Sequence, residues 1–175
     1  MLELVLILAA VAVVFGLVAA RRPADFQVTR SALMAAPAPI VFEQVNNLQN
    51  WDAWSPWAKL DPKAHHVFEG PEAGAGAIMR WAGNNKVGEG SMTIVASQPS
   101  ELIRFTLEFL KPFKATNTAE FTFKSEGGQT LVTWHMFGSN NFIGKAVSLF
   151  MNCDAMVGGQ FEQGLAAIKA IVERA

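Results

Sequence analysis

The feature that most constrains this chain is its C-terminal segment, Asn141 to Arg174, whose apolar residues recur mostly every three or four positions. That period is typical of a helix with one buried face. Asn152–Asp154 and Gly158–Gly159 interrupt it. We expect a short helix up to Met151 and a longer second helix, with Asp154 as a candidate N-cap. The buried face is formed by Ile143, Val147, Phe150, Met151, Val157, Phe161, Leu165, Ile168 and Val172.

The segment from Phe26 to Phe137 consists mainly of short stretches that alternate between apolar and polar residues. Alternation is clearest in Glu101–Phe109 and recurs in Thr116–Lys124 and Gln129–Phe137, so each stretch predicts a strand with one apolar face. Short turns join them, which favours antiparallel pairing. We therefore predict an α+β fold in which one dry sheet face covers the C-terminal helix. Other expected strands are 26–34, 65–69, 75–81 and 88–97, the last with Met92, Ile94 and Ala96 on one face.

Three tryptophans, Trp51, Trp54 and Trp57, fall within seven residues after a short predicted helix at Ile40–Val45. Trp51 and Trp54 are spaced to share a helix face, and Pro56 is expected to end that helix. Such aromatic density implies packing against something large and apolar. The rings either cap one end of the core or form the rim of a pocket entrance, and both readings stay open.

The N-terminal segment Leu2–Ala20 is apolar except for Glu3 and Gly16. As a helix it would be about 28 Å long, close to the thickness of a bilayer core. Arg21 and Arg22 follow the apolar run, whereas a signal peptide carries its positive charge before it. We predict an uncleaved inner-membrane anchor in residues 1–22 and a domain in 24–175 on the cytoplasmic side. Export after cleavage at the small residues before Arg21 is the alternative.

Net charge and cysteine content argue against nucleic-acid binding and against a fold held together by disulfides. The formal net charge of −1 gives no reason to expect a nucleic-acid surface. The single cysteine, Cys153, cannot form an intrachain disulfide, and we interpret it as a small core residue rather than a nucleophile.

The predicted inner face of the sheet offers almost no acid–base chemistry. By parity His135 lies on the outer face, and the adjacent His65 and His66 point to opposite faces. Asn117 is the one obvious polar residue on an inner face apart from Thr130. The sequence contains no glycine-rich dinucleotide motif and no serine nucleophile elbow. We therefore predict no catalytic set, no metal site and no cofactor.

Several motifs resemble the START-like, or Bet v 1-like, superfamily of helix-grip proteins, and in particular the bacterial SRPBCC group described as polyketide cyclase/dehydrase and lipid transport. The resemblance covers nearly all of Ala24 to Glu173. It implies a curved antiparallel sheet that wraps around the long C-terminal helix with a deep cavity between them. The motifs are Phe26–Ser31, Asn50–Trp57, Asp61–Pro62, Gly70–Pro71, Gly74–Gly76, Trp81–Asn85, Gly88–Ile94, Lys111–Phe113, Val132–Trp134 and Phe161–Leu165.

Strand parity and helical period together predict the residues that would line such a cavity, or fill it as core. Methionine and aromatic rings would suit a flat or acyl ligand. We expect a membrane-tethered module that binds a small hydrophobic or lipid-like molecule; an aromatase/cyclase-like enzyme and a ligand-free interaction domain are the alternatives. The predicted ligand contacts are Trp54, Met79, Trp81, Met92, Phe105, Leu107, Phe109, Asn117, Phe121, Trp134, Met136, Met156 and Phe161, with Ile94, Phe123 and Val157 beside them.

Overall fold

The computed structural model describes residues 1–140, 142–150 and 152–174, with only the backbone of Ile143 and Cys153. The expected helix end at Met151, the start of the segment at Asn141, the inward side chain of Ile143 and the core reading of Cys153 lie outside the described residues. The helices are α1 (Leu2–Arg21), α2 (Ala38–Asn46), the 3-10 turn η1 (Leu48–Asn50), α3 (Trp51–Trp54), α4 (Pro56–Leu60), α5 (Phe142–Val147) and α6 (Cys153–Val172).

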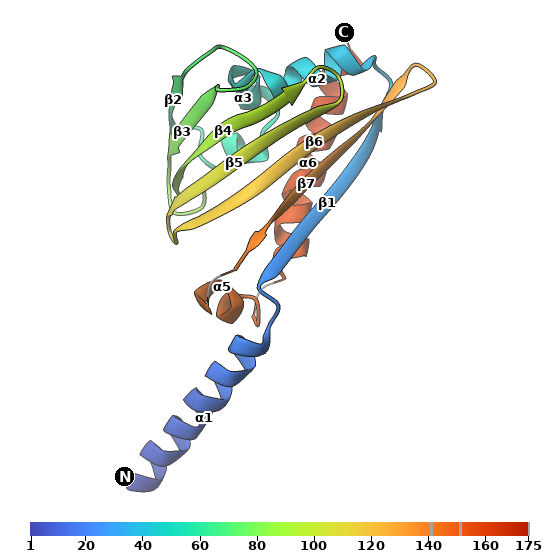
Figure 1. Ribbon diagram of the computed structural model, residues 1–175. Helices are drawn as coiled ribbons and strands as arrows, with labels where there is room; N and C mark the ends of the chain where they lie inside the picture. Colours follow the sequence, from blue (N-terminus) through green and yellow to red (C-terminus); the bar gives the residue numbers. More distant parts are fainter. Residues whose placement is uncertain (141, 151, 175) are drawn as a thin grey trace.

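A curved antiparallel sheet wraps around α6 (Figure 1). Its strand order is β1-β7-β6-β5-β4-β3-β2. The first strand therefore pairs with the last, and β1 forms the edge of the sheet that packs against α6. This arrangement confirms the predicted α+β helix-grip fold. The strands are β1 (Asp25–Met34), β2 (His65–Glu69), β3 (Ile78–Ala82), β4 (Glu89–Gln98), β5 (Leu102–Lys111), β6 (Ala115–Glu126) and β7 (Gln129–Ser139).

The inner face of the sheet is mostly apolar and buried, as the alternation predicted, and Arg30 on β1 is a charged exception. Phe121 and Trp134 lie opposite each other on β6 and β7, while Arg104 and Glu120 pair on the outer face. Strand β4 departs from the prediction because its register shifts between Ile94 and Ala96. Ala96 pairs with the outward-facing Arg104, so the expectation that it faces inward with Ile94 was wrong. The bulge inserts one residue and reverses the parity beyond it.

Helix α6 is continuous from Cys153 to Val172, so Gly158 and Gly159 do not interrupt it. Its N-cap is Asn152, whose side chain accepts a hydrogen bond from the Ala155 amide at 3.1 Å. The expectation that Asp154 is the N-cap was therefore wrong. Asp154 instead lies in the first turn, where its carboxylate faces an arginine on the sheet.

Arg30, on the inner face of β1, holds the first half of α6 against the sheet. Its Nε donates to Glu162 at 2.7 Å and its terminal nitrogens donate to Asp154 at 3.1 Å. These three residues form what we call the Arg30 cluster. The hydrogen bonds from Arg30 lower the pKa of Asp154. A side chain at Gly158 would overlap the guanidinium, so the missing side chain lets Arg30 lie flat on the helix.

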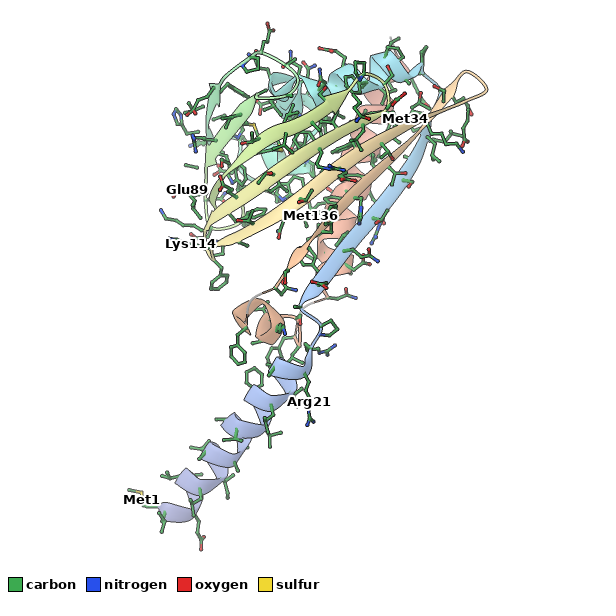
Figure 2. All side chains as sticks on the ribbon, in the orientation of Figure 1. Met1, Arg21, Met34, Glu89, Lys114 and Met136 are labelled. Atoms are coloured by element: carbon green, nitrogen blue, oxygen red, sulfur yellow. The ribbon has the colours of Figure 1, made fainter. Side chains whose placement is uncertain are left out.

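Helix α1 projects from the domain at the end where α5 lies (Figure 1). Its apolar side chains point outward along most of its length, from Met1 at the free end towards Arg21 near the domain, and Ala19 is buried (Figure 2). Phe15 stacks on Phe150, with ring centroids 5.8 Å apart. Among the described helices, α1 is long and apolar enough to cross a membrane, and a signal sequence would have the same properties.

The two adjacent glycines of α6 give a matched test of the Arg30 cluster. A β-carbon at Gly159 meets nothing within 4 Å. Gly159→Ala should therefore stabilise the protein by about 0.5–1 kcal/mol, because alanine favours a helix interior. Gly158→Ala should lower the melting temperature, because its methyl displaces Arg30. Thermal unfolding followed by circular dichroism measures both, and equal shifts of the same sign would contradict this role of Arg30.

The depressed pKa of Asp154 predicts a specific acid dependence. Its pKa lies below the ordinary value of 3.8, so its stabilising contribution is complete above that pH and is lost as the pH falls below it. The stability difference between wild type and Asp154→Asn should therefore be larger at about pH 6 than at about pH 2. Urea unfolding at both pH values measures this difference, and a gap that does not depend on pH would contradict the ion pair.

Candidate ligand cavity

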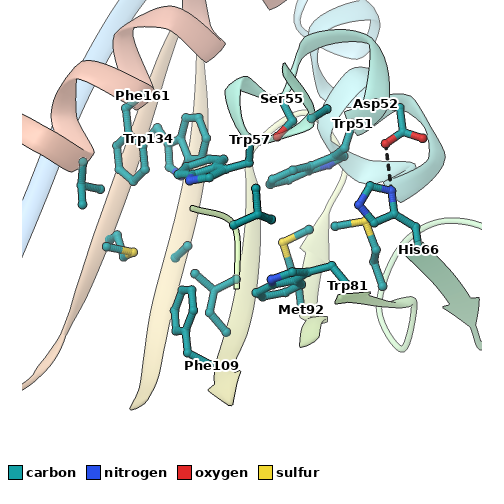
Figure 3. Close-up of a pocket in the computed structure, with 17 residues that line it drawn as sticks. Trp51, Asp52, Ser55, Trp57, His66, Trp81, Met92, Phe109, Trp134 and Phe161 are labelled. Atoms are coloured by element: carbon teal, nitrogen blue, oxygen red, sulfur yellow. Dashed lines mark ion pairs between the residues drawn. The ribbon is translucent and has the colours of Figure 1, made fainter. Parts of the chain in front are cut away.

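A cavity of about 210 Å³ lies between the inner face of the sheet, helix α6 and the short helices α3 and α4 (Figure 3). Its walls are almost entirely apolar. Asp52, Ser55 and His66 are the polar side chains on the wall other than the tryptophans. The lining residues are Trp51, Asp52, Ser55, Trp57, Ala58, His66, Met79, Trp81, Val87, Met92, Leu107, Phe109, Ala119, Trp134, Met136, Val157 and Phe161.

The tryptophan-rich segment forms one wall of the cavity. Trp51 Nε1 donates to the Val45 carbonyl at 3.0 Å, which fixes α3 against the end of α2. Trp54 also points into the core, whereas Trp51 and Trp57 reach the cavity. Both readings of this segment therefore apply, to different rings. Pro56 lies just after the end of α3 and is the first residue of α4. Proline is favoured at this position because the backbone N–H that it lacks would have no hydrogen-bond acceptor within the helix.

The opposite wall comes from strands β3 to β7, and β2 adds His66 at its edge. Trp81 of β3 and Phe109 of β5 meet edge to face, with ring centroids 5.8 Å apart. Trp134 of β7 stacks on Phe161 of α6 with centroids 3.9 Å apart and planes within 7°. This stack closes the cavity toward the packed end of the core.

The structure brings most of the predicted contact residues together around the cavity. Strand parity places them on the inner face, and the curvature of the sheet directs them toward α6. Val157 joins them from the helix. Those that line the cavity are Met79, Trp81, Met92, Leu107, Phe109, Trp134, Met136 and Phe161.

The other predicted contacts lie outside the cavity wall. Trp54, Phe105 and Phe121 are fully buried, because the rings of α3 cover this part of the sheet. Ile94 and Phe123 are buried in the same core. Asn117 lies over the backbone of Gly138, and Met156 is half exposed because it precedes Val157 on the helix and points away from the sheet.

Sequence reasoning did not identify the polar part of the wall. His66 Nδ1 lies 3.1 Å from the Asp52 carboxylate, and the two residues come from β2 and α3. His65 and His66 do face opposite sides, as predicted, but the partner of His66 is fourteen positions earlier in the sequence. Trp51 and Trp57 were considered only as a possible pocket rim and were not among the predicted ligand contacts. Ser55, Ala58, Val87 and Ala119 were also not predicted as lining residues.

Other titratable groups do not build a second site near the cavity. His135 lies on the outer face of β7, beside Phe137. The described residues include no group of three or more histidine, cysteine, aspartate or glutamate side chains that could hold a metal ion. Glu69, whose pKa is lowered by the hydrogen bond from Arg80, belongs to an exposed ion pair at the sheet edge.

The empty space can be tested without any ligand. Ala119 lines the cavity, whereas Ala77 is an equally buried alanine that does not. Ala119→Leu should change the free energy of unfolding by less than about 1 kcal/mol, or increase it, because its added carbons enter open space. Ala77→Leu should cost about 1–3 kcal/mol through overpacking. Denaturant unfolding measures both, and equal destabilisation would show that no usable space adjoins Ala119.

The fold and the cavity define a helix-grip protein with an apolar pocket between the sheet and α6. The family model described as polyketide cyclase / dehydrase and lipid transport matches residues 25–173, so the chain belongs to that family. No protein with a curated description matches the sequence.

Solved structures share the fold at low sequence identity. The Zhui aromatase/cyclase from Streptomyces sp. R1128 is 17% identical, with a TM-score of 0.61 and coverage of 86% of this chain and 94% of that one. Ara h 8.0201 is 12% identical, with a TM-score of 0.60 and coverage of 86% and 99%. Protein CV1439 from Chromobacterium violaceum is 14% identical, with a TM-score of 0.62 and coverage of 84% and 96%.

Proposed function

We propose that this protein binds a small, mostly apolar ligand in the cavity between the sheet and α6, and that α1 tethers it to a membrane. The observation that carries the proposal is an apolar cavity of about 210 Å³ in an otherwise packed core. Protein interiors are close-packed, and unfilled space of this size lowers the stability of a fold, so its presence is best explained by a function that needs it. A ligand-free interaction domain would have no need of it.

The volume limits the ligand. A cavity of about 150 Å³ holds benzene. By the same scale, space of 210 Å³ holds about eight non-hydrogen atoms. Because the cavity opens to solvent beside Asp52, a ligand of roughly eight to twelve such atoms can extend into the opening, as a substituted aromatic ring or a medium acyl chain would. A phospholipid with two chains does not fit inside, so lipid-like ligands are restricted to short molecules with one chain. The proposed contacts are Met79, Trp81, Met92, Leu107, Phe109, Trp134, Met136, Val157 and Phe161.

The membrane part of the proposal rests on α1 and its surroundings. The helix is apolar and exposed along its length, and Phe142 and Phe150 expose further apolar surface beside it. Arg21 and Arg22 stand between the helix and the domain, which favours an inner-membrane anchor with the domain in the cytoplasm. An apolar ligand partitions into the bilayer, so a tether of this kind keeps the cavity close to its source.

The second candidate function is an aromatase/cyclase-like reaction. It is favoured by the pairing of His66 with Asp52 on the cavity wall, the one arrangement among the described lining residues that could move a proton. The Zhui structure, described as an aromatase/cyclase, shares the fold. Turnover of a bound polyketide that is lost in His66→Asn would favour this function over simple binding.

Native mass spectrometry of the full chain, purified gently from its own host, tests ligand binding directly. Wild type should carry a reproducible added mass of roughly 110–200 Da, the mass of eight to twelve non-hydrogen atoms. Ala119→Leu should lose that mass because its side chain occupies the cavity. Met156→Ala is the matched control, because Met156 is exposed and lies off the cavity wall. A bare wild type that also ignores added short fatty acids and alkylphenols would contradict the proposal.

A further inference from the structure

The polar groups of the cavity wall are gathered on one side, where α3 approaches β2. Asp52 is 59% exposed and His66 is 20% exposed, so the pair forms part of the cavity rim with the carboxylate on the solvent side. Ser55 lies on the same wall and is buried. The remaining wall is carbon and sulfur, apart from the indole nitrogens. A ligand in this cavity therefore meets ionisable side chains at one end only. Elsewhere the polar groups among the lining side chains are indole N–H donors, of which Trp134 Nε1 is buried without a hydrogen-bond partner among the described residues.

The pairing with Asp52 fixes the orientation of the His66 ring. The Asp52 carboxylate lies 3.1 Å from Nδ1, and this contact favours the tautomer with the proton on Nδ1, because a carboxylate repels the lone pair of an unprotonated nitrogen. In the neutral ring this leaves the lone pair on Nε2. Figure 3 shows that second ring nitrogen turned toward the cavity. Among the described residues, Nε2 of His66 has no hydrogen-bond partner.

We infer that His66, oriented by Asp52, recognises a hydroxyl group at one end of the apolar ligand. The inference rests on the proposed binding function and names the class of ligand: an alcohol or phenol with an apolar body of about eight to twelve non-hydrogen atoms. The hydroxyl donates to Nε2 of His66. A ligand carboxylate is a poor match, because it brings no proton to the lone pair and would lie beside the negative charge of Asp52.

Isothermal titration of the full chain with isosteric probes tests this assignment. The probes are 4-propylphenol and 4-propyltoluene, which differ by a hydroxyl in place of a methyl, together with 4-propylbenzoate as the anionic comparison. The measured quantity is the ratio of the phenol affinity to the toluene affinity in each variant. Comparing this ratio between variants cancels the cost of transferring each probe from water, which is the same in every variant, and it also cancels any weakening that affects both probes equally.

His66→Asn keeps an amide donor for Asp52 but removes the acceptor that faces the cavity. It should lower the phenol-to-toluene ratio about tenfold, the value of one hydrogen bond. His65→Asn is the matched control, because His65 is exposed on the other face of the same strand. Its ratio should equal that of wild type. Asp52→Asn should lower the ratio by a smaller factor, since the ring loses its fixed orientation.

The contrary outcomes separate the two claims. An unchanged ratio in His66→Asn would overturn the role of His66 while leaving the apolar cavity intact. A fall in the benzoate-to-toluene ratio without a fall in the phenol ratio would overturn the hydroxyl assignment in favour of a carboxylate. If neither neutral probe bound wild type at all, the proposed binding function would fail, and the role of His66 with it.

Discussion

The stack of Trp134 on Phe161 sets the distance between the sheet and α6, and the rest of the interior is arranged around it. The rings lie nearly parallel with centroids 3.9 Å apart. Gly164, one turn further along the helix, leaves room for this approach, since a β-carbon there would lie 2.9 Å from the Trp134 ring. Trp51, Trp54 and Trp57 surround Trp134 edge-on, with centroid distances of 5.8–6.1 Å. Such pairs contribute about 0.5–1.5 kcal/mol each beyond the burial of their area.

This constraint divides the space under the sheet into two parts. Beyond the stack, Leu165 and Ile168 are fully buried and pack into a solid core. Before it, α6 is held by the Arg30 cluster at the edge of the sheet, and the rings of Phe161 and Trp134 prevent the helix from settling further inward. The cavity is the space left between these two fixed points. It is therefore a consequence of how the helix is held, and α6 could not move in to close it without breaking one of these two contacts.

Much of this arrangement could be predicted from local pattern. Alternation identified the inner faces of β5, β6 and β7, and helical spacing identified Val157, Phe161 and Leu165. The alternation gave the wrong face for Ala96, because a bulge after Ile94 inserts one residue into β4 and shifts the pairing with β5. Nothing in the local composition marks that bulge. It also failed to separate lining from core. Phe105 and Leu107 occupy equivalent positions on one strand, but only Phe105 lies beneath the rings of α3.

The polar end of the cavity shows a different limit. Asp52 and His66 belong to separate elements, and their meeting depends on where β2 docks at the sheet edge and how α3 is held by its tryptophans. The spacing of Asp52 and His66 in the sequence therefore does not predict their contact. The N-cap of α6 is Asn152 and not the expected Asp154 for a similar reason. Arg30 on β1, which is distant in the sequence, forms an ion pair with Asp154.

Ligand binding by this protein depends on open, apolar space between the sheet and α6. A crystal structure of the full chain under xenon pressure tests it most directly, because xenon enters dry apolar cavities. We expect xenon bounded by Met92, Phe109 and Trp134, with the surrounding side chains unmoved. A crystal structure with no xenon there, and with Trp81 or Phe109 turned inward to fill the space, would contradict the account.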